Sequence, residues 1–298
     1  MNHKVSIVIP AYNAELTIEK CVRSIMRSVN NTGASEIFET IVINDGSTDK
    51  TKKIISNLSG VRIINHERNL GLSSARNSGI NHSNSDYIIF IDSDIVISKN
   101  WVNSMYESIR EHKDIIGVTG DISSEPNKKI SSLDRYLFGK FRGIKNIKID
   151  TPLNYKFFVF SNTIVRRNIL NEIGLFDESL SKYGGEDTEL SIRMSKKFPA
   201  GLRKLKKATS YHITKKSIDQ YLNDMFIYGQ YNFHQIIKKH PDYKSDLGYS
   251  WVFSFKGLLF FNVLSRFLFK KILGVSKHPL VIKFLVIDSF IRGARNRA

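Results

Sequence analysis

Two patterns of apolar and polar positions alternate over the first 120 residues. Short continuous apolar runs predict buried strands, and they read VSIVIP from Val5, ETIVIN from Glu39, VRIIN from Val61 and YIIFID from Tyr87. Between the first two runs, apolar residues recur at helical spacing, at Ile18, Cys21, Val22, Ile25, Met26 and Val29. Polar turns followed by short helical stretches separate the later runs. Strands without polar alternation, separated by helices, predict an open α/β sheet that is mainly parallel and covered on both faces.

The apolar run YIIFIDSDIVI is interrupted by Asp92 and Asp94. A buried carboxylate without a partner is costly, so either a positive group lies there or the chain turns to water. The first and second strands also end in polar clusters, PAYN and NDGS. Ligands of open α/β sheets bind at the carboxyl ends of the strands. The two aspartates are therefore predicted to lie at the mouth of a shared crevice.

The pattern is looser after residue 120. A strand and a helix that ends at Gly174 are predicted, then a Gly-rich loop that opens a helix. Glu186 and Asp187 fall in the first turn of that helix, where the helix dipole favours negative charge. Three helices are expected after residue 215. The predicted domains are a catalytic domain at 1–215, with halves 1–120 and 121–215, and a helical extension at 216–298.

Charge and aromatic residues set the end of the chain apart. The net charge is +17, and from Ala200 onward there are 18 Lys+Arg against 5 Asp+Glu. Basic, aromatic-rich segments are typical of proteins that bind an anionic membrane surface or nucleic acid. No apolar run reaches the roughly 18 residues of a spanning helix, and the start lacks the pattern of a signal peptide. With a single cysteine, Cys21, interpreted as a core residue, this predicts a cytoplasmic protein.

Several motifs of other enzyme classes are absent. The sequence has no G-x-x-x-x-G-K-[ST] phosphate loop, no G-x-G-x-x-G after the first strand, no H-E-x-x-H and no G-x-S-x-G. What it has is Asp92-x-Asp94 after a strand. Mg²⁺ and Mn²⁺ prefer carboxylates and often take only one or two from the protein, so this pair predicts a divalent cation site. A solvated turn is the alternative.

Five segments together resemble the family-two inverting glycosyltransferases, which have the GT-A fold. They occur in the family's order over about residues 4 to 215, and they read VSIVIPAYNAE, IVINDGSTDKT, NLGLSSARNSGI, FIDSDI and GGEDTELSIRM. The resemblance implies a GT-A fold and transfer of a sugar from a nucleotide diphosphate donor, usually a UDP-sugar, with Mn²⁺ or Mg²⁺ and inversion at the anomeric carbon. The Q-x-x-R-W signature of processive members is missing, which suggests transfer of one sugar at a time.

The resemblance also implies roles for particular residues in binding the donor. It places Tyr12 near the uracil face, Asp45 at the uracil N3–H, Arg76 near the diphosphate, and Asp92 at the ribose or a water on the metal. The full set of implied donor-binding residues is Pro10, Ala11, Tyr12, Asn13, Glu15, Asp45, Gly71, Arg76, Asp92 and Ser93. Asn13 can in addition cap the following helix. The alternative role of Asp45 is that of a turn residue, and the alternative for Arg76 is a position on a solvated helix face.

The metal and catalytic roles follow from the same resemblance. It implies Asp94 as the direct metal ligand, His212 as another ligand, and Asp187 as the general base. Asn162 and Glu186 are assigned to the acceptor region. A structural role is the alternative for His212, and helix capping is that for the Glu-Asp pair.

The leading hypothesis is a metal-dependent transferase that moves one sugar from a UDP-sugar to a glycan or lipid-linked acceptor in cell-surface polysaccharide assembly. The alternatives are a sugar-nucleotide pyrophosphorylase, which would need a Gly-rich, Arg-containing loop after the first strand, and a non-catalytic basic protein. Residues 249–297 are expected to bind the inner face of the plasma membrane rather than nucleic acid. A lid or a homodimer contact is the other reading of this segment.

Overall fold

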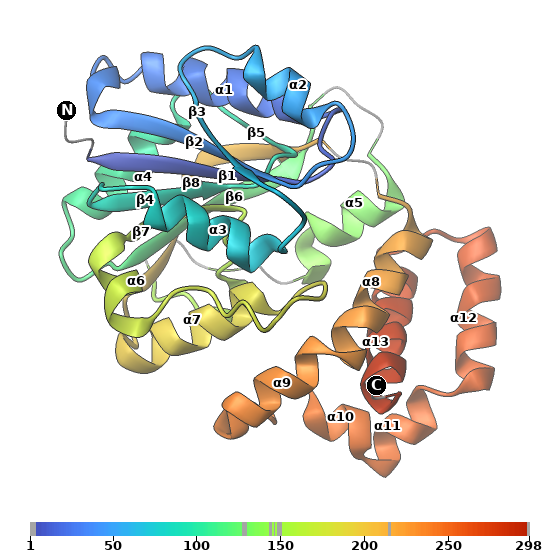
Figure 1. The fold of residues 1–298 in the computed structure, drawn as a ribbon. Coiled ribbons are helices and arrows are strands. Elements are labelled where there is room, and N and C mark those ends of the chain that lie inside the picture. The colour runs from blue at the N-terminus through green and yellow to red at the C-terminus, as the bar shows by residue number, and fades with distance from the viewer. Residues whose placement is uncertain are drawn as a thin grey trace. The chain divides into compact units, whose positions relative to one another are not determined.

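The structure, a computed structural model, describes residues 4–126, 130–142, 145, 147, 151–213 and 216–296. The chain divides into two compact units (Figure 1). The sheet unit comprises residues 1–128, 147–178 and 186–214, and the helical unit comprises 129–146, 179–185 and 215–298. The expected boundary at residue 215 itself lies outside the described residues. Two short segments from the middle of the chain, 129–146 and 179–185, thus group with the end of the chain.

One mixed sheet forms the centre of the sheet unit, with eight strands among the described residues in the order β3-β2-β1-β4-β7-β6-β8-β5. The strands are β1 (Val5–Ala11), β2 (Phe38–Asp45), β3 (Arg62–His66), β4 (Tyr87–Ile91), β5 (Ile95–Ile97), β6 (Gly117–Ser124), β7 (Asn162–Arg166) and β8 (Leu202–His212). Strands β3, β2, β1 and β4 run parallel, as do β6 and β8, whereas β7 is antiparallel to both of its neighbours. The predicted mainly parallel α/β sheet is confirmed.

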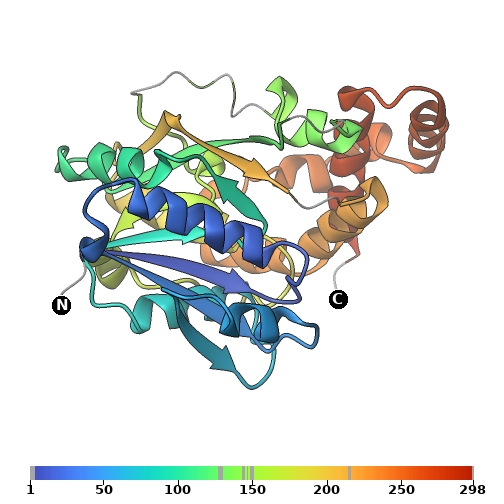
Figure 2. The same ribbon diagram turned by 90° about the horizontal axis from the view of Figure 1, so that it is seen from above.

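Helices cover both faces of this sheet (Figure 2). They are α1 (Ile18–Asn30), α2 (Thr51–Ser56), α3 (Leu72–Asn81), α4 (Trp101–Arg110), α6 (Arg167–Ile173) and α7 (Glu186–Lys197), with short 3₁₀ turns at Ser35–Ile37 and Tyr155–Phe157. Along β1, Ile7 packs with α1, α2 and α4, while the next residue, Val8, packs with α3, α6 and α7. Because successive side chains of a strand point to opposite faces, an uninterrupted apolar run such as β1 is what two covered faces require.

The run from Tyr87 to Ile97 forms two strands. Strand β4 ends at Ile91, and β5 begins at Ile95. Strand β5 is the outermost strand at the opposite side of the sheet from β3, and it pairs with β8. Asp92 and Asp94 lie in the turn between β4 and β5, so the chain leaves the core there. Strands β5, β6 and β8 and helix α4 were not predicted. The three residues of β5 read as the end of the run that starts at Tyr87, and polar residues interrupt the apolar ones in β6, β8 and α4.

Cys21 is buried on α1, as predicted. The helix-cap interpretation of Asn13 is wrong, because α1 starts at Ile18, five residues later, and its N-cap is Thr17. Asn13 instead has a left-handed φ of 48°. An Asn side chain tolerates this conformation because it can form hydrogen bonds with nearby backbone.

The helical unit contains more helices than the three expected after residue 215. They are α5 (Ser132–Leu137), α8 (Ile218–Gln230), α9 (Asn232–Lys239), α10 (Tyr249–Phe253), α11 (Phe255–Phe260), α12 (Val263–Val275) and α13 (Pro279–Arg295), with 3₁₀ turns at Lys140–Arg142 and Pro241–Tyr243. The extra breaks have local causes. Gly248 is left-handed, the side chains of Ser254 and Asn262 accept N-cap hydrogen bonds, and Pro279 starts α13.

Helices α8 and α13 pack closely at two glycines. A Cβ added to Gly229 would lie 2.2 Å from the carbonyl oxygen of Phe290, and one added to Gly293 would lie 2.0 Å from that of Phe226. Any larger residue would push the helices apart. None of the helices in the described part of the chain has the length and apolar character needed to cross a membrane.

Candidate active site

Three polar clusters follow the carboxyl ends of β1, β2 and β4. These strands are neighbours and run parallel, so the prediction that their ends share one edge of the sheet is confirmed. The loop after β1 holds Tyr12 and Asn13, β2 ends with Asp45, and Asp92 directly follows β4. Most of the predicted site residues therefore gather at this edge, from parts of the chain that are far apart in sequence.

A buried arginine is the positive partner that the Asp92 carboxylate requires. Arg76, on α3, is 1% exposed, and its Nη2 donates to Asp92 Oδ1 at 3.0 Å. Its Nη1 donates to Asp187 Oδ1 at 2.7 Å and lies 3.9 Å from Glu186 Oε1. The guanidinium also lies over the ring of Phe176, 5.2 Å from the centroid. One cation thus joins the end of β4 to the first turn of α7, and its own partner Asp187 lies 111 positions away in the sequence.

Burial and mutual charge shift the pKa values in this cluster. Burial alone would lower the pKa of Arg76, but the three surrounding carboxylates raise it. Desolvation raises the pKa of Asp92, and Arg76 opposes that shift. Desolvation and the charge of Asp187 raise the pKa of Glu186 from its ordinary 4.5 to about 7. The cluster therefore holds one acid, Glu186, that is partly protonated near neutral pH.

Replacing Glu186 by Gln is expected to flatten the pH dependence of the unfolding free energy between pH 4.5 and about 7. Because the pKa of Glu186 is raised in the folded protein, the folded state binds more protons than the unfolded state in this window. The wild type therefore loses stability as the pH rises through it, and the Gln variant does not. Urea unfolding at closely spaced pH values measures the difference. Glu107→Gln, at an exposed position on α4, is the control; parallel curves for the wild type and E186Q would contradict the prediction.

Asp94 and His212 meet where β5 pairs with β8. Ile95 is opposite His212 in the register, and His212 Nε2 lies 3.1 Å from Asp94 Oδ2. Both side chains are about one quarter exposed, at 28% and 26%. A carboxylate oxygen and an imidazole nitrogen are a donor set that suits Mn²⁺, so these residues fit a metal. Within the described ranges no group of three His, Cys, Asp or Glu side chains could hold a metal ion. Water would supply the ligands that these two residues do not.

Hydrogen bonds fix the carboxylate of Asp45 at the end of β2. Its oxygens accept from the backbone N–H groups of Leu70 and Gly71, at 2.9 and 3.0 Å. Oδ1 also lies 2.7 Å from His66 Nδ1, and His66 Nε2 lies 2.8 Å from Ser78 Oγ. Each carboxylate oxygen has two lone pairs, so Asp45 keeps acceptor capacity. Sequence reasoning missed His66 and Ser78, although His66 ends β3 at the same sheet edge.

The loops after β1 and β2 bind each other. The backbone N–H groups of Thr48 and Lys50 donate to the side chains of Asn13 and Glu15, at 2.9 and 3.0 Å. These bonds hold Tyr12 in a solvent-facing position, with 49% of it exposed. An aromatic ring in such a position can stack on a flat base.

Exposure differs widely among the predicted residues, and Asp45, like Arg76, is buried, with 3% of it exposed. Pro10 and Ala11 are buried in β1, and Ser93 is half-buried between the two aspartates. Asn162 on β7 is 0% exposed, and its Nδ2 donates to Ser210 Oγ at 2.7 Å. The contact of Asn162 with a sugar therefore stays a prediction, because this side chain is buried and hydrogen-bonded within the sheet. The guanidinium of Arg76 likewise faces carboxylates, so its predicted place near a diphosphate stays a prediction.

A family model and several known proteins match the chain. The model of glycosyl transferase family 2 matches residues 6–174. The minor teichoic acid biosynthesis protein GgaB of Bacillus subtilis is 26% identical over 252 residues, which cover 80% of this chain and 27% of GgaB. The chain spans 17 to 60% of the length of the first curated relatives that it matches.

Two solved structures share the fold. TarS 1–349 from S. aureus, solved in complex with UDP-GlcNAc, is 18% identical with a TM-score of 0.55, and the match covers 98% of this chain and 90% of that one. The mannosyltransferase PcManGT from Pyrobaculum calidifontis, solved with GDP-Man and Mn²⁺, is 14% identical with a TM-score of 0.66, covering 99% and 86%. At these identities the likeness concerns the fold.

Proposed function

Because the chain belongs to glycosyl transferase family 2, we propose that it is a metal-dependent, inverting, non-processive transferase that moves one hexose from a UDP-sugar to a glycan or lipid-linked acceptor. The observation that carries this proposal is the cluster around Arg76. One guanidinium holds both Asp92, beside the Asp94–His212 pair, and Asp187, in the first turn of α7. The residues proposed as metal ligands and the carboxylate proposed as general base thus lie on either side of Asp92 and Arg76.

The proposed reaction divides the residues into two groups. Asp94 and His212 would hold the divalent metal, Mn²⁺ or Mg²⁺, which supplies positive charge to the diphosphate leaving group. Asp45 and Tyr12 orient the uracil, through its N3–H and its face. Asp187 takes the proton of the acceptor hydroxyl while that oxygen attacks the anomeric carbon. The bond from that carbon to the diphosphate breaks, its electron pair leaves with UDP, and this single displacement inverts the carbon.

The catalytic carboxylate is oriented for such a role. Asp187 Oδ1 accepts from Arg76, and Oδ2 accepts from the backbone N–H of Phe160 at 3.2 Å. Each oxygen retains one lone pair, and 17% of the side chain is exposed. The carboxylate is therefore held in one orientation while keeping the capacity to accept a proton.

The proposed setting is polysaccharide or glycoconjugate assembly on the cytoplasmic face of the plasma membrane, with a lipid-linked glycan as acceptor. The name of the relative GgaB, a teichoic acid biosynthesis protein, supports an acceptor of this class. The donor proposal is supported by the fold shared with TarS, which was solved with UDP-GlcNAc. The family membership argues against the sugar-nucleotide pyrophosphorylase and the non-catalytic alternatives.

Calorimetric titration with UDP and Mn²⁺ tests the donor and the metal together. The wild type should bind UDP more tightly with Mn²⁺ than without it. In Asp94→Asn the metal-dependent gain should be lost, and affinity should fall by about tenfold or more, because each 1.4 kcal/mol of lost interaction is worth tenfold. Asp114→Asn, at a position 71% exposed, is the control and should bind as the wild type does.

Two results would contradict the proposal. One is no UDP binding by the wild type with Mn²⁺ present, and the other is an unchanged metal-dependent gain in Asp94→Asn. A UDP-release assay over a panel of sugar nucleotides then identifies the sugar that is transferred.

A further inference from the structure

Two consecutive helices of the helical unit expose an unusual number of large apolar side chains. In α11, Phe255 is 78% exposed, and in α12, Val263 and Leu264 are 73% and 81% exposed. The full set on these helices is Phe255, Leu258, Leu259, Phe260, Val263, Leu264, Phe267, Leu268 and Val275. We call these nine residues the apolar face. Contiguous exposed apolar residues of this extent mark a surface that binds a partner.

Helix α12 has two different sides, and among the described residues of the unit the inner side makes the contacts that follow. On the inner side, Arg266 Nε donates to Asp288 Oδ2 at 2.6 Å, and the ring of Phe269 stacks on Phe284 with centroids 3.7 Å apart. The inner residues recur at helical spacing. Leu264 and Phe267 lie on the outer side, three positions apart. The inner contacts therefore hold α12 so that the apolar face stays exposed.

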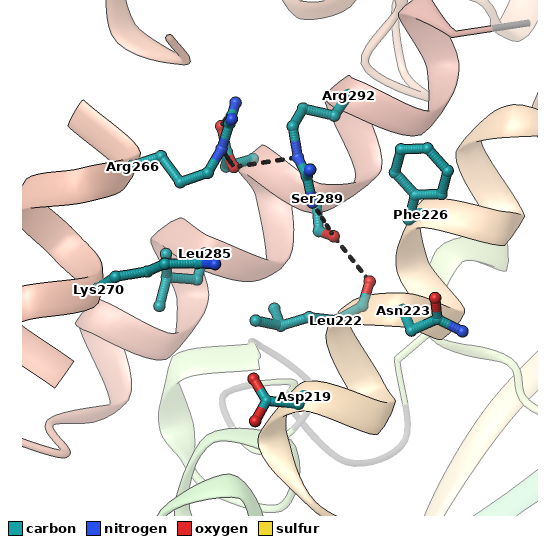
Figure 3. Close-up of a pocket in the computed structure, with 10 residues that line it drawn as sticks. Asp219, Leu222, Asn223, Phe226, Arg266, Lys270, Leu285, Ser289 and Arg292 are labelled. Carbon is teal, nitrogen blue, oxygen red and sulfur yellow. Dashed lines mark hydrogen bonds and ion pairs between the residues drawn. The ribbon is translucent and has the colours of Figure 1, made fainter. Parts of the chain in front are cut away.

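A cavity of about 360 Å³ lies between α8, α12 and α13, but it does not account for the apolar face. Figure 3 shows Arg266 and Lys270 of α12 and Asp219 of α8 among the residues that line it. Its two arginines face Asp288, which is 1% exposed; Arg292 Nε lies 3.6 Å from the carboxylate. These charges compensate one another. The ion pair of Arg266 with Asp288 at the cavity holds α12 against α13, and none of the nine residues lines the cavity.

Along the stretch of chain that carries the apolar face, the exposed charge has one sign. From Tyr249 to Asn296 the sequence has eight Lys+Arg and one acidic residue, Asp288, which is buried. Lys256 on α11 and Lys271 on α12 are exposed, and Lys271 Nζ lies 4.6 Å from the ring centroid of Phe267. Apolar side chains with interspersed lysines and no exposed acid are the pattern of a helix that lies in the headgroup region of an anionic bilayer.

We infer that the apolar face and the lysines beside it bind the surface of an anionic lipid bilayer, with α11 and α12 lying in the interface. The nine apolar side chains enter the acyl boundary, and Lys256 and Lys271 contact lipid phosphates. A second copy of the chain would bring the same basic charge against itself, since a two-fold interface pairs identical patches. Nucleic acid would match the charge but leave the apolar side chains in water. An anionic bilayer is the partner that matches both the basic charge and the exposed apolar side chains.

This inference rests on the proposed function. It adds to that function the surface that brings the transferase to a lipid-linked acceptor. Its test is flotation of the full chain with vesicles at low salt, in the absence of any sugar nucleotide. The protein should float with phosphatidylglycerol vesicles and much less with phosphatidylcholine vesicles, because anionic lipids add electrostatic attraction.

Matched variants separate the apolar and charged contributions. Leu264→Ser combined with Phe267→Ser should lower binding to phosphatidylglycerol by about a hundredfold, since each buried large apolar side chain contributes about tenfold. Leu16→Ser, at a position 86% exposed in the sheet unit, is the control for Leu264→Ser, at 81%. Lys256→Glu with Lys271→Glu should remove the preference for anionic lipid, whereas Lys206→Glu with Lys207→Glu, the same change of charge on β8, should keep it.

Three results would overturn the inference. The first is no flotation of the wild type with phosphatidylglycerol, and the second is flotation of the apolar variant equal to that of Leu16→Ser. The third is a lipid-free dimer in sedimentation that Leu264→Ser with Phe267→Ser dissociates, because the apolar face would then bind a second copy. UDP titration of the same variants reports on the donor site alone, so failure of flotation with UDP binding intact leaves the proposed transferase standing.

Discussion

Replacing Asp187 by Asn is expected to lower turnover by about 10²–10⁴-fold, the usual cost of losing a general base. The amide keeps the shape of the carboxylate and can still accept from Arg76 or from the Phe160 N–H, but it cannot take a proton. Binding of UDP and Mn²⁺ should change little, because Asp94 and His212 are untouched. A UDP-release assay with donor and acceptor measures turnover, and calorimetry measures binding on the same preparation.

The neighbouring acid provides the decisive comparison. The pKa of Glu186 is raised to about 7 by desolvation and by Asp187, and a base is most effective when its pKa is near the working pH. Glu186 is, however, only 9% exposed and lies 3.9 Å from Arg76 Nη1, whereas Asp187 is hydrogen-bonded to that nitrogen and is more exposed. Glu186→Gln should therefore retain most of the turnover. If Glu186→Gln were inactive and Asp187→Asn nearly normal, the two roles would have to be exchanged.

The predictable part of the fold is the part in which one type of residue dominates each element. Strands β1 and β4 and the centre of β2, Ile41–Ile43, are nearly pure apolar runs, because helices cover both of their faces. Strand β8 reads LRKLKKATSYH, and its exposed residues Lys206 and Lys207 mask the buried ones beside them. Strand β6 begins with glycine and ends with serines. Such strands of mixed composition are specified by their neighbours in the sheet more than by their own pattern.

The candidate site likewise has a part that the sequence predicts and a part that depends on how distant elements pack. The positions of Asp45 and Asp92 at strand ends follow from the apolar runs before them. The partners of Arg76 do not, since they come from residues 16 and 111 positions away and depend on how α3 and α7 pack. The link from Asp45 through His66 to Ser78 likewise joins three separate elements. In the helical unit, apolar residues on every side of α11 and α12 concealed the caps at Ser254 and Asn262 that divide these helices.

Replacing Arg76 by Met is expected to destabilise the sheet unit by about 3–5 kcal/mol, the cost of removing one partner from a buried ion pair. Met fills a similar volume but leaves Asp92, Asp187 and Glu186 facing one another without a cation. Urea unfolding followed by tryptophan fluorescence in a Trp251→Phe background reports on this unit, because Trp101 is then the remaining tryptophan and is fully buried on α4. Arg110→Met is the control, because its partner Glu111 is exposed and such surface pairs contribute about 0–1 kcal/mol.

The loss should also depend on pH in a defined direction. Without Arg76, the carboxylates repel one another and their pKa values rise further in the folded state, so this state binds more protons than the unfolded state. Stability of the variant must then increase as the pH falls from 8 toward 5, and the difference from the wild type must shrink. Arg76→Lys keeps the charge but lacks the planar fork that reaches Asp92 and Asp187 together, so its stability should fall between the two. Equal unfolding free energies of the wild type and Arg76→Met at pH 8 would show that the carboxylates find another compensating charge, and that Arg76 does not hold the two halves of the site together.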